Sequence, residues 1–181
     1  MRAMLSSDVE KFMPCVPLIL AATVFVTVSC AAHTKKKKDL FLLFFFYLAL
    51  NGILCFTLFR TPGKVYPPKA IDLSFHGTWR DGLQGQIFVI ENFVLFLPLG
   101  FFGRALFQNT GKTVLFGFLL SLSIEVLQVI FKLGYGEVND LIQNTLGTVT
   151  GACLYLYLLS VRRIIVREWE RIELEELSEE T

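Results

Sequence analysis

Long apolar stretches alternate with short polar ones along this chain of 181 residues. A helix that crosses the hydrocarbon core of a bilayer needs about 20 consecutive, mostly apolar residues. Stretches of this kind cover residues 14–32, 40–59, 87–107, 113–133 and 141–161. The pattern therefore predicts an all-α fold, a polytopic transmembrane bundle of about five helices in one membrane domain that spans residues 1–181.

The amino-acid composition agrees with a membrane location. Hydrophobic residues make up 54% of the chain and charged residues only 18%, whereas soluble domains average about 45–50% apolar and about 25% charged residues. A protein of this size has too little interior to bury the excess, so a lipid bilayer is its expected partner. The formal net charge of +1 gives no sign of nucleic-acid binding, and no nucleic-acid partner is expected.

The charges that flank the first apolar stretch are in the reverse order of those in a signal peptide. Asp8 and Glu10 precede the stretch, and four lysines at positions 35–38 follow it. We therefore expect a retained helix. Basic clusters favour the cytoplasm, so the lysines predict an N-out, C-in arrangement. The loop 60–86 is then expected to be extracytoplasmic, and the charged tail 162–181 to be a cytoplasmic, amphipathic extension of the last helix.

One carboxyl is expected deep within the fourth apolar stretch. Glu125 lies near the middle of residues 113–133, where a charged group costs about 2.5–3.5 kcal/mol on insertion scales. Because such residues are expensive, they usually mark a functional site. A carboxyl that only hydrogen-bonds to a neighbouring helix is the alternative, and the sequence leaves both open. Gln128 follows at a spacing that places it on the same helical face.

The third and fifth stretches also carry polar and small residues. Asp140, Asn144, Gly147 and Gly151 share one helical face, and an outward-facing polar cleft between the last three helices is therefore predicted. Its candidate ligand-binding residues are Glu91, Asn92, Glu125, Gln128, Asp140 and Asn144. Pro98, Gly100, Gly147 and Gly151 are candidates for helix packing, because small residues allow close approach and proline kinks a helix.

The sequence lacks the patterns typical of a metal or catalytic site. His33 and His76 are far apart in the chain, and neither a nucleophile elbow nor a phosphate-binding glycine loop is present. The four cysteines lie in or beside apolar stretches without metal-ligand spacing. We therefore expect no metal and no cofactor, assign no catalytic residue, and favour a non-catalytic protein over an enzyme.

Three short motifs follow one another along the last three apolar stretches. ENFVLFLPLG begins at Glu91, EVLQ begins at Glu125, and the third motif is Asn139-Asp140 followed by Asn144-Thr145-Leu146-Gly147 and Gly151. Together they resemble the VanZ-like family over about residues 51–159. The resemblance implies a small, multi-pass protein of the bacterial plasma membrane and cell envelope. It also implies an association with lowered susceptibility to glycopeptide antibiotics such as teicoplanin.

Three classes of function remain open from the sequence. In the first, which the sequence favours, the protein binds an amphiphile such as a lipid-linked cell-wall precursor or a lipoglycopeptide in the polar cleft. In the second, it is a small proton- or ion-coupled transporter or channel in which Glu125 titrates, and which would need to oligomerise. In the third, it is a membrane enzyme that acts on a lipid-linked substrate, with Glu125 or Asp140 as the general base.

Overall fold

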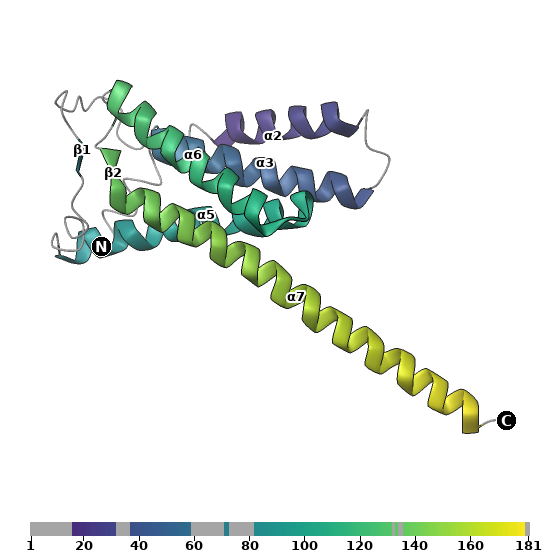
Figure 1. Ribbon diagram of the computed structural model, residues 1–181. Helices are drawn as coiled ribbons and strands as arrows, with labels where there is room; N and C mark the ends of the chain where they lie inside the picture. Colours follow the sequence, from purple (N-terminus) through teal and green to yellow (C-terminus); the bar gives the residue numbers. More distant parts are fainter. Residues whose placement is uncertain are drawn as a thin grey trace.

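The computed structural model describes residues 16–31, 37–58, 71–72, 82–131, 133 and 136–179. These residues form helices α2 (Val16–Ala31), α3 (Lys37–Leu58), α5 (Gly82–Phe107), α6 (Thr110–Phe131) and α7 (Val138–Glu179), as Figure 1 shows. Strands β1 (Ile71–Asp72) and β2 (Gly136–Glu137) form a short parallel pair in which Ile71 lies opposite Gly136. The predicted all-α transmembrane bundle is confirmed, and the strand pair is a feature that the sequence pattern did not predict.

Four of the described helices are long and apolar enough to cross a membrane. The parts that qualify are Lys38–Leu58, Gln86–Phe107, Thr110–Phe131 and Val138–Glu175. Helix α2 has 16 residues, which gives it a length of about 24 Å, somewhat short of the ~30 Å hydrocarbon core. Residues 14–15 and 32 of the predicted first segment lie outside the described residues.

Helix α6 begins earlier than the apolar pattern indicates, because Asn109 caps it. The Oδ1 atom of Asn109 accepts a hydrogen bond from the N–H of Lys112 at 2.9 Å, which satisfies a donor that the helix end would leave unpaired. Gln108 has a φ of 52°, so the chain reverses direction within two residues.

Because α6 ends at Phe131, Glu125 lies six residues from that end, and not at the predicted midpoint.

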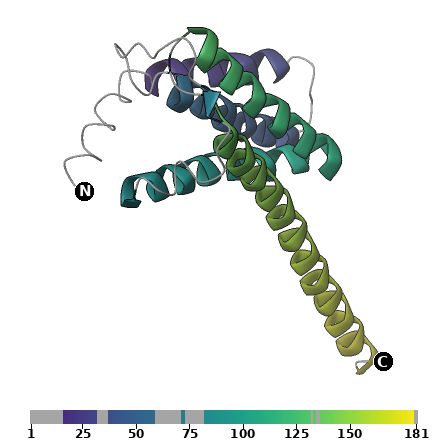
Figure 2. The ribbon, with the colours of Figure 1, turned by 60° about the vertical axis from the view of Figure 1, so that its left-hand side comes forward.

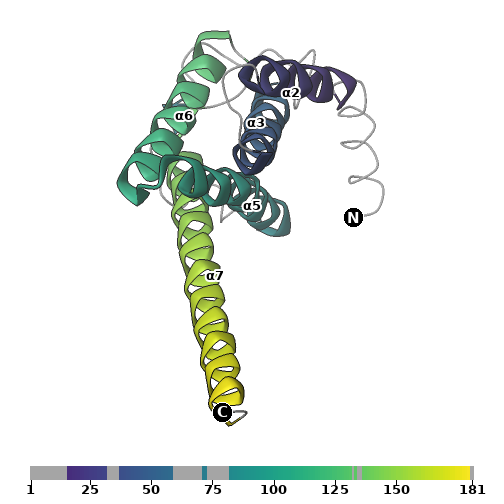
Figure 3. The same ribbon diagram turned by 90° about the vertical axis from the view of Figure 1, so that its right-hand side faces the viewer.

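Helices α5 and α7 also extend beyond their predicted apolar stretches. Helix α5 starts at Gly82, so residues 82–86 of the predicted loop are helical. Helix α7 continues without a break through the described part of the tail to Glu179. Its 42 residues give a length of about 63 Å, roughly twice the thickness of a hydrocarbon core. Figures 1, 2 and 3 show its C-terminal half projecting away from the other helices.

The interior of the bundle is a small apolar core around α5. Helix α5 packs against α3 and α7, and α6 packs against α7. The buried cluster at the centre joins residues from α3, α5 and α6, namely Phe46, Ile53, Phe96, Leu99 and Ile124. Many other large apolar side chains of the described helices are exposed, as expected where lipid covers the surface.

The basic residues of the described helices gather at one end of the bundle. Lys38 lies at the start of α3, Arg104 near the end of α5, and Lys112 near the start of α6. The C-terminal half of α7 extends toward the same end, whereas β1 and β2 lie at the other (Figure 1). This grouping agrees with the positive-inside rule. The side of the membrane on which each end lies stays a prediction.

Cysteine labelling should resolve the orientation. In a variant without native cysteines, an impermeant maleimide added to intact cells should label Lys69→Cys, because the loop 60–86 is expected outside. Lys36→Cys and Glu170→Cys should react only after permeabilisation, because basic clusters favour the cytoplasm. Lys36 and Lys69 lie outside the described residues, and Glu170 is exposed on α7. Labelling in the opposite pattern would overturn the N-out, C-in prediction.

Candidate functional site

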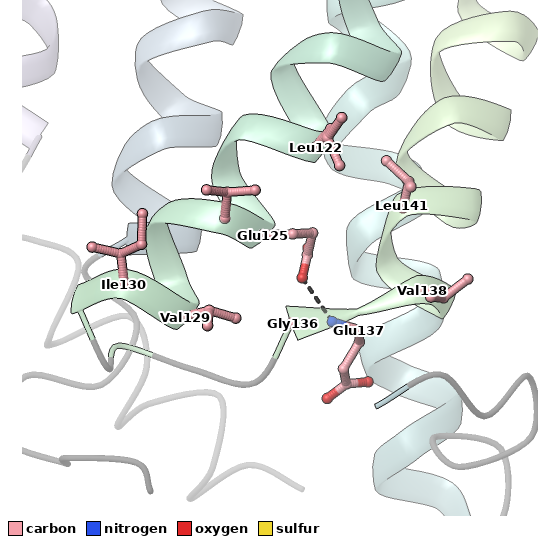
Figure 4. Close-up of a pocket in the computed structure, with 9 residues that line it drawn as sticks. Leu122, Glu125, Val129, Ile130, Gly136, Glu137, Val138 and Leu141 are labelled. Carbon is pink, nitrogen blue, oxygen red and sulfur yellow. Dashed lines mark hydrogen bonds between the residues drawn. The ribbon is translucent and has the colours of Figure 1, made fainter. Parts of the chain in front are cut away.

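The buried carboxyl of α6 is bonded to strand β2. Glu125 is 8% exposed, and its Oε2 atom accepts a hydrogen bond from the main-chain N–H of Glu137 at 2.8 Å. Figure 4 shows the side chain reaching from α6 across to the strand that precedes α7. An unpaired backbone N–H in hydrocarbon costs several kcal/mol. Glu125 therefore stabilises the connection between α6 and α7.

Two more carboxyls surround Glu125. Asp140 in the first turn of α7 and Glu137 on β2 lie close enough to interact with it electrostatically. Each of these two residues also has a further interaction partner. Three acidic residues, one each from α6, β2 and α7, therefore meet at this point of the bundle. Within the described parts of the chain, no cluster of three or more His, Cys, Asp or Glu side chains is placed to hold a metal ion.

A pocket of about 290 Å³ opens beside Glu125. Its walls come from α6, β2 and the start of α7, and consist of Leu122, Glu125, Val126, Val129, Ile130, Gly136, Glu137, Val138 and Leu141 (Figure 4). Apart from the two glutamates, every side chain in this wall is aliphatic. Leu122, Val126 and Ile130 are 40%, 47% and 64% exposed, so the mouth of the pocket lies on the apolar surface of a membrane-spanning helix.

A second polar contact joins α6 and α7 about one helical turn from Glu125. The Nδ2 atom of Asn144 donates a hydrogen bond to Oγ of Ser121 at 2.9 Å, and both side chains are buried. The Oδ1 atom of Asn144 is buried as well, and it has no hydrogen-bond partner among the residues that the structure describes. This amide oxygen is therefore an acceptor that the described part of the protein leaves unused.

The other candidate residues have separate surroundings. Nε2 of Gln128 donates a hydrogen bond to the carbonyl oxygen of Thr57 at 3.0 Å, so this side chain binds α3. On α5, Asn92 is buried and Glu91 is exposed. The described contacts thus connect Glu125 with β2 and Asp140, and Asn144 with α6. The single polar cleft shared by all six candidate residues stays a prediction.

Glycines bring α5 and α7 into backbone contact at the positions that the sequence marked for packing. A Cβ atom on Gly147 would overlap the carbonyl oxygen of Phe93, and one on Gly151 would overlap that of Leu97. A Cβ atom on Gly100 would overlap the backbone of Thr148. Pro98 lies inside α5, which continues through it to Phe107.

The sequence analysis missed two residues of this packing site. A Cβ atom on Gly117 would overlap the side chain of Thr148, so α6 also approaches α7 closely. Thr148 of α7 thus contacts both α5, at Gly100, and α6, at Gly117. It is fully buried where the three helices meet. The repeat of small residues at Thr113, Gly117 and Ser121, four positions apart, is the signal that could have identified this face.

Comparisons with known proteins identify a family and a relative that this chain matches. A family model described as VanZ/LLP1 matches residues 18–161, which include the whole of α5, α6 and the first half of α7. The chain is also 34% identical over 86 residues to Protein VanZ from Enterococcus faecium. That alignment covers 46% of this chain and 52% of the relative, so it spans about half of the relative's length. No solved structure matches the chain.

Proposed function

Because the chain belongs to the VanZ/LLP1 family, we propose that it is a protein of the bacterial plasma membrane that lowers susceptibility to glycopeptide antibiotics such as teicoplanin. In this proposal the protein binds an amphiphile, either a lipid-linked cell-wall component or a lipoglycopeptide, at the site around Glu125. The protein acts by binding, and no reaction is part of the proposal.

The observation that carries the proposal is the placement of Glu125. Its carboxyl is buried on a membrane-spanning helix and lies in the wall of an otherwise mostly aliphatic pocket. Ionisable groups inside membrane segments are costly and usually serve a function. An amphiphile matches both parts of such a site, because its apolar chain suits the aliphatic walls and its polar part can bond to the carboxyl.

One observation also favours a second candidate, a proton-coupled transporter. Glu125 and Asp140 are neighbouring acids on two membrane-spanning helices, and chains of acidic residues within the membrane form proton relays in pumps and transporters. Flux driven by a pH gradient across liposomes that contain the purified protein would favour this candidate over amphiphile binding.

Expression of the protein tests the proposal directly. In a teicoplanin-sensitive Gram-positive host, cells that produce the chain should tolerate a higher teicoplanin concentration than cells with an empty vector. The protein purified into lipid nanodiscs should carry a bound amphiphile that native mass spectrometry detects. Unchanged susceptibility in cells with confirmed membrane expression, together with the absence of any bound amphiphile, would contradict the proposal.

A further inference from the structure

A buried, uncharged polar centre lies between α5, α6 and α7, about one turn of α6 deeper in the bundle than Glu125. Its side chains are Asn92 on α5, Ser121 on α6 and Asn144 on α7, and each of them is at most 5% exposed. We propose that this centre binds internal water, which bridges the three helices. The inference concerns this site alone, so it holds or fails independently of the proposed function.

The first observation is the unused hydrogen-bonding capacity of α6 and α7. Asn144 donates a hydrogen bond to Oγ of Ser121 at 2.9 Å, but its own Oδ1 atom is buried without a partner among the described residues. The hydroxyl of Ser121 accepts in this bond, so it can donate its hydrogen to a further partner. A polar group left unpaired among membrane helices is costly, and a bridging water removes that cost.

The second observation brings Asn92 of α5 to the same depth. Gly147 of α7 lies against Phe93 and Phe96 of α5, and the next turn of α7 meets the next turn of α5, so the two helices run in the same direction. Asn92 lies one turn before Phe96 on the same face of α5. Asn144 lies about one turn before Gly147 on the same face of α7. Both amides therefore precede this close contact by about one turn.

The third observation is that Asn92 also has bonding capacity to spare. It is 5% exposed, and no hydrogen bond joins its amide to another residue that the structure describes. The remaining exposed surface is within reach of a water molecule. Buried waters typically bond to about three polar groups that would otherwise stay unpaired. Asn92, Ser121 and Asn144 together supply such a set.

Burial and neutrality favour water over other occupants of this centre. The three side chains carry no charge, and Glu125 turns away from them to bond to β2 (Figure 4), so a cation would find only neutral ligands. None of the three side chains lines the pocket beside Glu125. A larger polar molecule would have to separate α5 from α7 beside a contact in which their backbones touch.

Radiolytic footprinting of the protein in lipid nanodiscs tests the inference. An X-ray pulse converts water into hydroxyl radicals, which oxidise the side chains that they touch, and mass spectrometry locates the oxidised residues. Phe96 is 0% exposed, so radicals from bulk water do not reach it, whereas Phe46 in the apolar core is 6% exposed. Internal water beside Asn92 should nevertheless make the oxidation of Phe96 several-fold faster than that of Phe46.

A matched pair of variants assigns this oxidation to the polar centre. Asn144→Leu keeps the size of the side chain but removes its hydrogen-bonding atoms, so the oxidation of Phe96 should be lost. Asn51→Leu makes the same change on α3, where Asn51 bonds to Thr23, and should leave Phe96 oxidation unchanged. Ser121→Ala removes only a hydroxyl, and it should lower Phe96 oxidation even where the leucine variant does not fold.

Two results would overturn the inference. One is protection of Phe96 from oxidation in the parent protein, which is expected if the two amides bond to each other directly and hold no water. The other is undiminished oxidation of Phe96 in every folded variant of Asn144 and Ser121.

Discussion

Gly147→Ala should lower the free energy of unfolding by about 1–3 kcal/mol, as overpacking of a close interface typically does. A Cβ atom at this position would overlap the carbonyl oxygen of Phe93 on α5. Main chain cannot move aside as a flexible side chain can, so α5 and α7 must separate. Loss of their close contact removes the packing that holds membrane helices together. Unfolding of the purified protein by titration with sodium dodecyl sulfate measures the effect.

Gly52→Ala is the matched control for this experiment. Gly52 lies within α3, and a Cβ atom there would have no heavy atom from elsewhere in the described structure within 4 Å. Since alanine favours a helix over glycine by up to about 1 kcal/mol, this variant should be as stable as the parent or slightly more stable. Equal loss of stability in both variants would show that the glycines of α7 do not mark a close helix contact.

Glu125→Gln should return teicoplanin tolerance to the level of the empty vector while leaving the fold intact. The amide oxygen of glutamine can still accept the hydrogen bond from the Glu137 N–H, so the link between α6 and β2 persists. What changes is the acidic group that the ligand is proposed to contact. A single hydrogen bond typically contributes about 0.5–1.5 kcal/mol, so amphiphile affinity should fall about two- to tenfold. Minimum inhibitory concentrations, read beside membrane expression levels, give the result.

Glu170→Gln makes the same chemical change on the exposed C-terminal part of α7 and should keep full tolerance. The melting temperatures of both variants in nanodiscs should match that of the parent. A well-expressed Glu125→Gln protein with full tolerance would show that the carboxyl serves only the fold. The hydrogen bond to β2 would then be its whole role.

The helices could be predicted from the sequence because their apolar stretches are long. The positions of the helix ends were predicted less accurately, because the ends depend on local hydrogen bonds that the apolar pattern does not show. Asn109 begins α6 through its side-chain bond to Lys112, and the charged residues after position 161 continue α7 as a helix. The close contacts at Gly147 and Gly151 were predictable, because small residues at helical spacing in a membrane helix usually allow another helix to approach closely.

The surroundings of Glu125 could be predicted only in part. Its burial on a membrane helix followed from its position in an apolar stretch. Its partner did not, because the Glu137 N–H is main chain and carries no signal in the residue type. Strands of two residues have no periodic pattern to detect. The spacing places Gln128 on the same helical face as Glu125. Its side chain nevertheless bonds to the carbonyl oxygen of Thr57, because α3 packs beside α6 at this position.

The pairing of β1 with β2 also limits when these contacts can form during synthesis. Ile71 pairs with Gly136, and both α5 and α6 lie between them in the chain. The pair can therefore form only after these two helices have left the ribosome. Closing so long a loop costs conformational entropy. The Glu137 N–H belongs to the later strand as well, and it lies only 12 residues after Glu125 in the chain. Both contacts become possible when β2 emerges, but the Glu125 bond closes a short loop, whereas the strand pair closes a much longer one that contains two helices.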